Sequence, residues 1–158
     1  MLEAYRQHTA DRAALGIPPL PLDAEQTSAL CELLQHPPAG EEANLIALLR
    51  DRVPPGVDPA AYVKAGFLTS ITTGKVTCPL INKVEAIELL GTMLGGYNVR
   101  SLIDLLQSDN TELATAAVKA LSKIVLVYDA FNDVWELSQT NPYAKQVIDA
   151  WANADWFT

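Results

Sequence analysis

The spacing of apolar residues constrains this chain more than any other feature of its sequence. Leucine, isoleucine and valine recur every three or four positions along nearly the whole chain, as at Leu30, Leu33 and Leu34. This is the period of a helix that buries one face. No segment has the alternation of a half-buried strand, and the only strand-favouring stretches, 76–77 and 125–127, are short. The sequence therefore predicts an all-α protein with about eight or nine short helices.

Short polar side chains mark where several of these helices begin. Asp23 with Gln26 and Asn82 with Glu85 have the spacing of capping boxes, and Asp58 precedes a proline. Glycines and prolines mark where helices end. These signals predict helices at 2–15, 23–36, 41–53, 58–73, 82–94, 98–106, 111–128, 129–139 and 141–156.

Two stretches have the pattern of paired antiparallel helices. Residues 102–106, a turn at 109–110 and residues 116–124 follow the spacing of a HEAT repeat, in which each helix pair stacks on the next. Residues 30–49 repeat the pattern less faithfully. We expect HEAT-like antiparallel pairs in a single domain spanning 1–158, with the very apolar helix 111–128 at its centre. An irregular helical bundle is the alternative.

Composition narrows the class of protein. The chain has 158 residues, 49% of them hydrophobic, which is typical of a globular domain and not of a disordered one. Nineteen acidic residues against 11 basic ones give a net charge of −8, so the molecule repels nucleic acids. The basic pairs Arg50–Arg52 and Lys119–Lys123 form no phosphate-binding stripe. No apolar run is long enough for a membrane span, and charges near the first residues argue against export, so we expect a cytoplasmic protein.

The sequence contains few groups suited to catalysis. It has no nucleophile elbow, phosphate-binding loop or zinc-protease motif. Its two histidines, His8 and His36, have no evident partner along the sequence. Its two cysteines, Cys31 and Cys78, form no CxxC pair. We expect Cys31 to act as a small core residue, and we expect no metal site within this chain.

One cluster of acidic residues has the spacing of a possible functional site. Asp129, Asp133 and Glu136 are spaced to share one helical face, where carboxylates could hold a hard cation or act as an acid–base pair. Phe131, Val134 and Trp135 lie between them, and we expect these three to supply the buried side of the same helix. We therefore interpret the carboxylates as a solvated acidic face.

Several longer segments resemble the amino-terminal domain of bacterial aconitase B. They occur in the same order along essentially the whole chain. The matching segments are PPAGEE (37–42), RVPPGVD (52–58), AAYVKAGFL (60–68), AIELLGTMLGGYN (86–98) and AKQVIDAWANADWF (144–157).

This resemblance implies part of a much longer citric-acid-cycle lyase, which interconverts citrate and isocitrate through cis-aconitate on a [4Fe-4S] cluster. In that family the amino-terminal part is a HEAT-like interaction domain that shapes access to the active site. The cluster ligands lie outside it, so the resemblance implies no catalytic residue and no cofactor here. The implied partners are the remaining domains, with a homodimer or other metabolic proteins also possible. A freestanding HEAT-like adaptor is the alternative, and whether the chain is an excised domain or a separate protein stays open.

Within the longest matching segment, the candidate interface residues are Gly95, Gly96, Tyr97 and Asn98. The glycines suit the end of a helix and Asn98 suits the cap of the next one, so the loop could be a connector only. A turn does not require the large aromatic Tyr97, and such residues often anchor protein interfaces. We therefore expect Tyr97 to be at least partly exposed, on the surface that the remaining domains cover.

Overall fold

The computed structural model describes residues 1–124, 126–127 and 130–154. Over these residues the chain forms nine α-helices and no strand, which confirms the predicted fold class. The helices are α1 (Leu2–Ala14), α2 (Ala24–Gln35), α3 (Glu42–Asp51), α4 (Pro59–Thr72), α5 (Lys83–Leu90), α6 (Val99–Leu105), α7 (Thr111–Leu121), α8 (Ala130–Ser138) and α9 (Pro142–Ala152).

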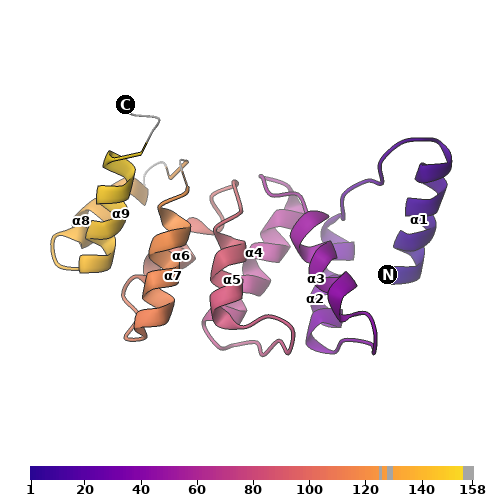
Figure 1. The fold of residues 1–158 in the computed structure, drawn as a ribbon, viewed down its shortest axis with the longest axis horizontal. Helices are drawn as coiled ribbons and strands as arrows, with labels where there is room; N and C mark the ends of the chain where they lie inside the picture. Colours follow the sequence, from indigo (N-terminus) through magenta and orange to yellow (C-terminus); the bar gives the residue numbers. More distant parts are fainter. Residues whose placement is uncertain (125, 128–129, 155–158) are drawn as a thin grey trace.

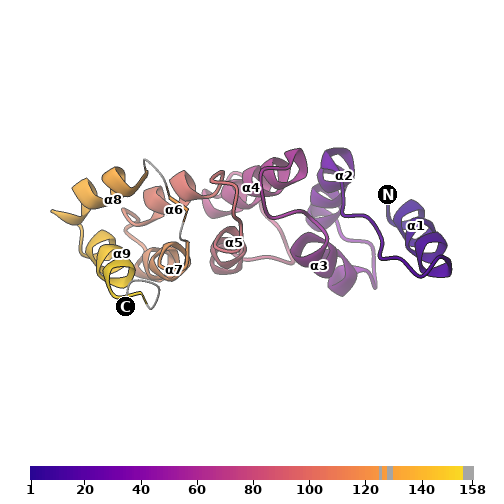
Figure 2. The same ribbon diagram turned by 90° about the horizontal axis from the view of Figure 1, so that it is seen from above.

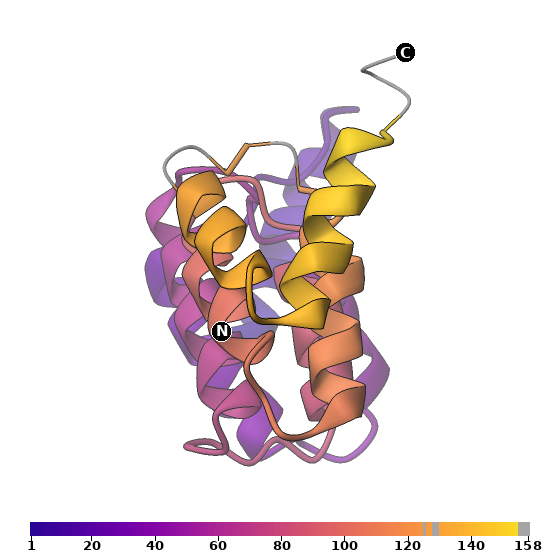
Figure 3. The same ribbon diagram turned by 90° about the vertical axis from the view of Figure 1, so that its left-hand side faces the viewer.

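Eight of these helices form four pairs that stack in a row. The pairs are α2 with α3, α4 with α5, α6 with α7 and α8 with α9, and the two helices of each pair pack against each other and run in opposite directions (Figure 1). Seen from above, α2, α4, α6 and α8 form one layer, and α3, α5, α7 and α9 form the other (Figure 2). The view along the row shows the same two layers end on (Figure 3). The predicted antiparallel pairs are therefore present.

Helix α7 belongs to the third of the four pairs and has an exposed polar face at Glu112, Thr115 and Lys119, so it is not enclosed at the centre as predicted. It packs against α5, α6 and α9, and Ala117 and Leu121 are fully buried. Its extent was predicted wrongly, because the helix ends at Leu121 rather than continuing to position 128. The Ser122 hydroxyl donates a hydrogen bond to the Val118 carbonyl, and the chain then turns at Ile124. Serine competes in this way with the helical backbone for hydrogen bonds.

The predicted helix starts are confirmed where the capping signal was strongest. The side chains of Asp23 and Asn82 each accept a hydrogen bond from the backbone N–H three residues further on, at Gln26 and Glu85. The Gln26 and Glu85 side chains in turn accept hydrogen bonds from the backbone N–H groups of Asp23 and Asn82. Asp58 accepts a bond from the Ala60 N–H at 2.8 Å. Asn141 caps α9 in the same manner, through the Tyr143 and Ala144 N–H groups. Each such cap satisfies donors that the first helical turn leaves unpaired.

Polar contacts attach α1 to the row of pairs. The Tyr5 hydroxyl donates to the Leu20 carbonyl and accepts a 2.9 Å bond from Arg52 Nε. His8 Nε2 accepts a bond from the Leu20 N–H at 3.0 Å. Arg52 and His8 therefore hold the proline-rich segment between α1 and α2 in place.

Lys64, on α4, is an unusual core residue, because only 2% of it is exposed. Burial lowers the pKa of its ammonium group to about 8, while the nearby carboxylate of Asp51 and the thiol of Cys31 act in the opposite direction and Arg50 reinforces the lowering. A buried cation of this kind destabilises the folded state wherever it is protonated.

We expect Lys64→Met to raise the free energy of unfolding at pH 7 by about 2 kcal/mol, because methionine fills similar space without a charge. The unfolded chain keeps this proton up to a pKa of 10.5 and the folded chain loses it near 8. Between these values the unfolded state binds more protons, so this group's contribution to stability rises with pH. Urea unfolding of the native chain and the variant from pH 7 to pH 10 measures the difference.

The same titration needs two controls. Burial raises the pKa of the Cys31 thiol from 9.0 to about 12, and Lys64 opposes this rise. Ionisation of Cys31 therefore lowers stability above pH 9 by different amounts in the two proteins, so their slopes are compared below pH 9. Lys75→Met removes an exposed lysine and should leave the pH profile parallel to that of the native chain. Parallel profiles for Lys64→Met would contradict the assignment of a buried charge.

Candidate functional site

Four exposed apolar side chains gather where two loops meet. They are Val57, Tyr62, Leu94 and Tyr97, which are 77%, 63%, 59% and 38% exposed. Val57 lies in the α3–α4 loop, Tyr62 in the first turn of α4, and Leu94 and Tyr97 in the α5–α6 loop. We call this set the aromatic patch. Neighbouring exposed apolar residues commonly mark a surface that another molecule covers.

Direct contacts hold the patch together. The Leu94 N–H donates a 2.7 Å hydrogen bond to the Pro55 carbonyl. The Tyr97 hydroxyl lies 3.4 Å from the Val57 carbonyl and donates to it. The Tyr62 and Tyr97 rings pack edge to face, with centroids 4.5 Å apart and planes at 70°, a favoured geometry for aromatic pairs. The two loops therefore present the four side chains as one surface.

Gly95 allows the loops to approach this closely. A Cβ atom at this position would lie 2.3 Å from the Gly56 carbonyl oxygen, far inside van der Waals contact. Gly96 has φ +84°, a conformation that favours glycine. Neither residue ends α5 as predicted, because that helix already ends at Leu90, with Gly91 as its C-cap. A Cβ on Gly91 would lie 2.9 Å from the Ala120 Cβ, so glycine there lets α5 and α7 pack tightly.

The prediction that Asn98 caps α6 with its side chain was wrong. Asn98 is the N-cap residue but makes no side-chain cap hydrogen bond. Its amide nitrogen instead donates to the Leu90 carbonyl at 2.6 Å and the Met93 carbonyl at 3.2 Å. Those carbonyls lie at and just beyond the end of α5 and need donors. Asn98 is fully buried, so it closes the loop from inside and takes no part in an exposed interface.

Tyr97 is partly exposed, as predicted, while its role at an interface stays a prediction. The sequence alone did not identify Val57, Tyr62 and Leu94 as members of this surface. The last two follow the apolar spacing of their helical segments, so nothing in their sequence context separates them from core residues. Val57, between a Pro-Pro-Gly turn and the Asp58 cap, was the one detectable signal, because a connecting loop gives an aliphatic side chain little to pack against.

We expect Gly95→Ala to lower the free energy of unfolding by about 1–3 kcal/mol, since the added methyl group forces the two loop backbones apart. Urea unfolding measures the change. Gly66→Ala is the matched control, because nothing lies within 4 Å of a Cβ at that exposed position in α4, where alanine favours the helix. Equal stability of the two variants would contradict the close contact between the loops.

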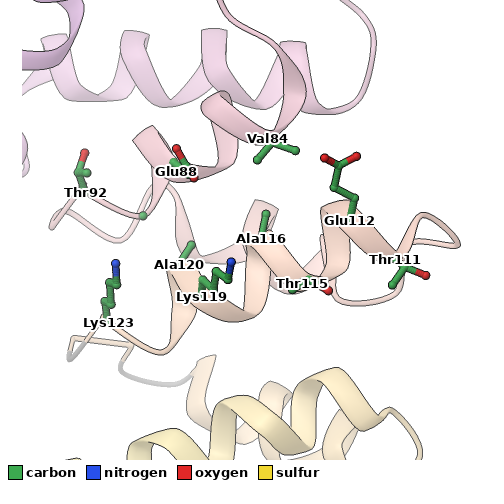
Figure 4. Close-up of a pocket in the computed structure, with 11 residues that line it drawn as sticks. Val84, Glu88, Thr92, Thr111, Glu112, Thr115, Ala116, Lys119, Ala120 and Lys123 are labelled. Carbon is green, nitrogen blue, oxygen red and sulfur yellow. The ribbon is translucent and has the colours of Figure 1, made fainter.

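A second surface feature is a groove of about 750 Å³ between α5 and α7. Figure 4 shows Glu88 from α5 opposite Lys119 from α7 and Lys123 from the turn that follows it, with Glu112 near the other end. Threonine hydroxyls and small side chains complete its lining. Neither lysine has a carboxylate within ion-pair distance among the described residues. The groove has mixed charge and contains no histidine or cysteine.

The structure describes two of the three carboxylates in the acidic cluster that the sequence analysis considered. Asp133 pairs with Arg100 at 2.7 Å and Glu136 is exposed, while Asp129 lies outside the described residues. Among the residues that the structure describes, no three histidine, cysteine or carboxylate side chains lie close enough together to hold a metal ion. His36 is an exposed C-cap residue of α2.

The donor set does not fit an iron–sulfur cluster. Such clusters are held mainly by several cysteine thiolates, and this chain has two cysteines in total. Cys31 and Cys78 are both buried with free thiols, and Cys78 Sγ donates to the Leu34 carbonyl at 3.3 Å. The raised pKa of Cys31, caused mainly by burial, disfavours the thiolate that a metal requires. No step of a reaction is therefore assigned to a cluster in this chain.

Fold and surface together define an all-α protein of stacked antiparallel helix pairs with an exposed aromatic patch. None of its described helices has the length and hydrophobicity needed to cross a bilayer. The family model described as the aconitate B N-terminal domain matches residues 4–157. The chain therefore belongs to the aconitase B N-terminal domain family.

Curated relatives agree with this assignment. The chain is 68% identical to an aconitate hydratase B of Synechocystis sp. over 157 residues. It is 59% identical to that of Escherichia coli K12 and 47% identical to that of Helicobacter pylori. Each alignment covers 99% of this chain but 18% of the relative. The chain thus spans less than a fifth of the length of these relatives.

Proposed function

We propose that this chain is the non-catalytic interaction and scaffold domain of an aconitate hydratase B. It forms a HEAT-like support that docks on the remaining domains of the enzyme, in the cytoplasm, and helps to shape access to the active site. Those domains supply the [4Fe-4S] cluster and all groups that interconvert citrate and isocitrate. The proposal rests on the family match and on the absence of a fitting donor set among this chain's two cysteines and two histidines.

The aromatic patch is the observation that supports docking most directly. Two tyrosines and two aliphatic side chains are exposed together, and tyrosine is among the residues that contribute most to binding energy when an interface buries them. The loops are tied by the Leu94–Pro55 hydrogen bond and the Gly95–Gly56 contact. A surface fixed in this way loses little conformational entropy on binding. We assign the patch to the contact with the remaining domains.

The docking proposal can be tested in trans. The 158-residue chain is mixed with the Synechocystis aconitate hydratase B from which the matching region has been removed, and binding is measured by calorimetry. We expect a complex whose affinity falls at least about tenfold in the double variant Tyr62→Ser, Tyr97→Ser, because truncating each anchor costs more than ~1 kcal/mol. Leu20→Ser, which removes an exposed apolar side chain far from the patch in sequence, should bind normally.

Two alternative hypotheses, self-association and a freestanding adaptor, predict different results for this experiment. If the chain self-associates through the patch, the native chain alone shows a concentration-dependent mass that the double variant loses. If the chain is a freestanding adaptor, it does not bind the shortened enzyme, and its reading frame does not continue beyond codon 158 into lyase sequence. Absence of a complex, or a complex that both variants form equally well, would contradict docking through the patch.

A further inference from the structure

Two aromatic side chains are exposed on α8, far along the row from the aromatic patch. Phe131 is 43% and Trp135 51% exposed. The prediction that both lie on the buried side of this helix was therefore wrong, and only Val134 of the three is buried. No further helix pair follows α8 and α9 among the described residues to cover them. Their rings stack at 6.5 Å with planes 11° apart. Phe131 also stacks at 6.0 Å on Trp151 of α9, whose indole N–H donates to the Leu121 carbonyl at 3.0 Å. The pair is therefore fixed on the packed core by Trp151 while its outer surface faces solvent.

The direction in which Phe131 and Trp135 point follows from a contact on the opposite side of α8. Asp133 bonds to Arg100 of α6 at 2.7 Å, so its side of α8 faces the preceding pair. Phe131 and Trp135 are each two positions from Asp133 and thus about 160° away around the helix. They face away from α6. Because α8 is the last helix of its layer (Figure 2), they face the open end of the row.

The two ends of the row differ in chemistry. At the other end lies α1 (Figure 1), a mainly polar helix in which Tyr5 is the one residue classed as buried. Stacked-helix proteins need terminal units with a polar outer face, because an apolar end invites further packing. Helix α1 meets this requirement along its length, while Leu15, Ile17 and Leu20, which follow it, are exposed aliphatic side chains without an aromatic among them. The α8 end, with an exposed phenylalanine and an exposed tryptophan, does not.

We propose that the polypeptide that follows this domain in full-length aconitate hydratase B packs on Phe131 and Trp135 and so continues the row. This inference rests on the proposed function. The matching family is described as an N-terminal domain, and the match covers 18% of each relative, so most of the enzyme follows it. The last described helix, α9, is paired with α8. The following polypeptide therefore leaves the domain beside this apolar end, where its effective concentration is highest.

The test uses this chain fused in frame to the remainder of the Synechocystis enzyme, in place of that enzyme's own matching region. Hydroxyl-radical footprinting with peptide mass spectrometry compares oxidation rates in the fusion and in the 158-residue chain. We expect Trp135 and Phe131 to react about fivefold more slowly in the fusion, as their exposure falls to that of an interface core. Trp151, which is 8% exposed, should react slowly in both proteins.

The same experiment separates this inference from the proposed function. If Tyr62 and Tyr97 become protected but Trp135 does not, the domain docks and the inference about α8 is wrong. If none of the four residues is protected, both proposals fail. If Trp135 is already protected in the 158-residue chain, and dilution or truncation after residue 154 removes the protection, a second copy or the chain's own end covers the face and the inference is overturned.

A substitution provides a second readout. Trp135→Gln should leave the thermal midpoint of the isolated chain within a few degrees of the native value, because the residue is half exposed. In the fusion it should speed limited proteolysis between the domain and the following polypeptide severalfold. Glu136→Gln, an exposed neighbour on the same helix, is the matched control and should have no effect. Equal proteolysis of the two variants would contradict the proposed contact.

Discussion

Leu121→Asp is expected to unfold the domain. Leu121 is fully buried near the end of α7, the helix that packs against α5, α6 and α9. An aspartate there leaves a carboxylate without a partner, at a cost of several kcal/mol against a total stability of roughly 5–15 kcal/mol. Far-UV circular dichroism and the thermal midpoint should both show loss of the native state. A soluble variant with native dichroism and an unchanged midpoint would contradict the packing.

Two further variants keep this prediction informative if the aspartate variant aggregates. Thr115→Asp introduces the same charge at an exposed position of α7 and should remain folded. Leu121→Ala should also remain folded, with the free energy of unfolding lowered by about 2–5 kcal/mol through cavity formation. An alanine variant as stable as the native chain would show that Leu121 does not contribute to the core as the structure places it.

Local signals predicted the helical fold well because they act over a few residues. Capping boxes at Asp23 and Asn82 fix where helices start, since a short polar side chain there satisfies first-turn donors. The hairpin of α6 and α7 was also predictable, because both helices carry a clear apolar stripe around a short turn. The resemblance of several sequence segments to aconitase B and the match to the family model indicate the same class of domain.

Contacts between elements determine where α5 ends and which helices pair, and the sequence did not predict these features. Helix α5 ends at Leu90, earlier than predicted, because Gly91 packs against Ala120 and Asn98 binds the carbonyls that follow. These partners come from outside the helix. The pairing of α4 with α5 was also missed, because the long connection at 73–82 hides the repeat. The pairing of α8 with α9 was missed although the connection at 139–141 is short.

The candidate site was predictable only in part. Tyr97 was identified because an aromatic residue is not needed in a turn, and its exposure followed. Its companions Tyr62 and Val57 come from a loop and helix about forty positions earlier in the chain. Only the folded structure brings them together. For Asn98 the prediction was wrong in the other direction. The sequence suits an exposed helix cap, but the side chain is buried and donates a hydrogen bond from the α5–α6 loop to the Leu90 carbonyl at the end of α5.

In the function proposed above, this domain contributes contacts and no chemistry to aconitate hydratase B. The most direct test is the aconitase activity of the pure 158-residue chain after incubation with iron and sulfide under reducing conditions, with the full-length Escherichia coli enzyme reconstituted in parallel. We expect no conversion of citrate to isocitrate by the chain, because two buried cysteines cannot hold a cluster. Measurable conversion by the pure chain would contradict the proposed function.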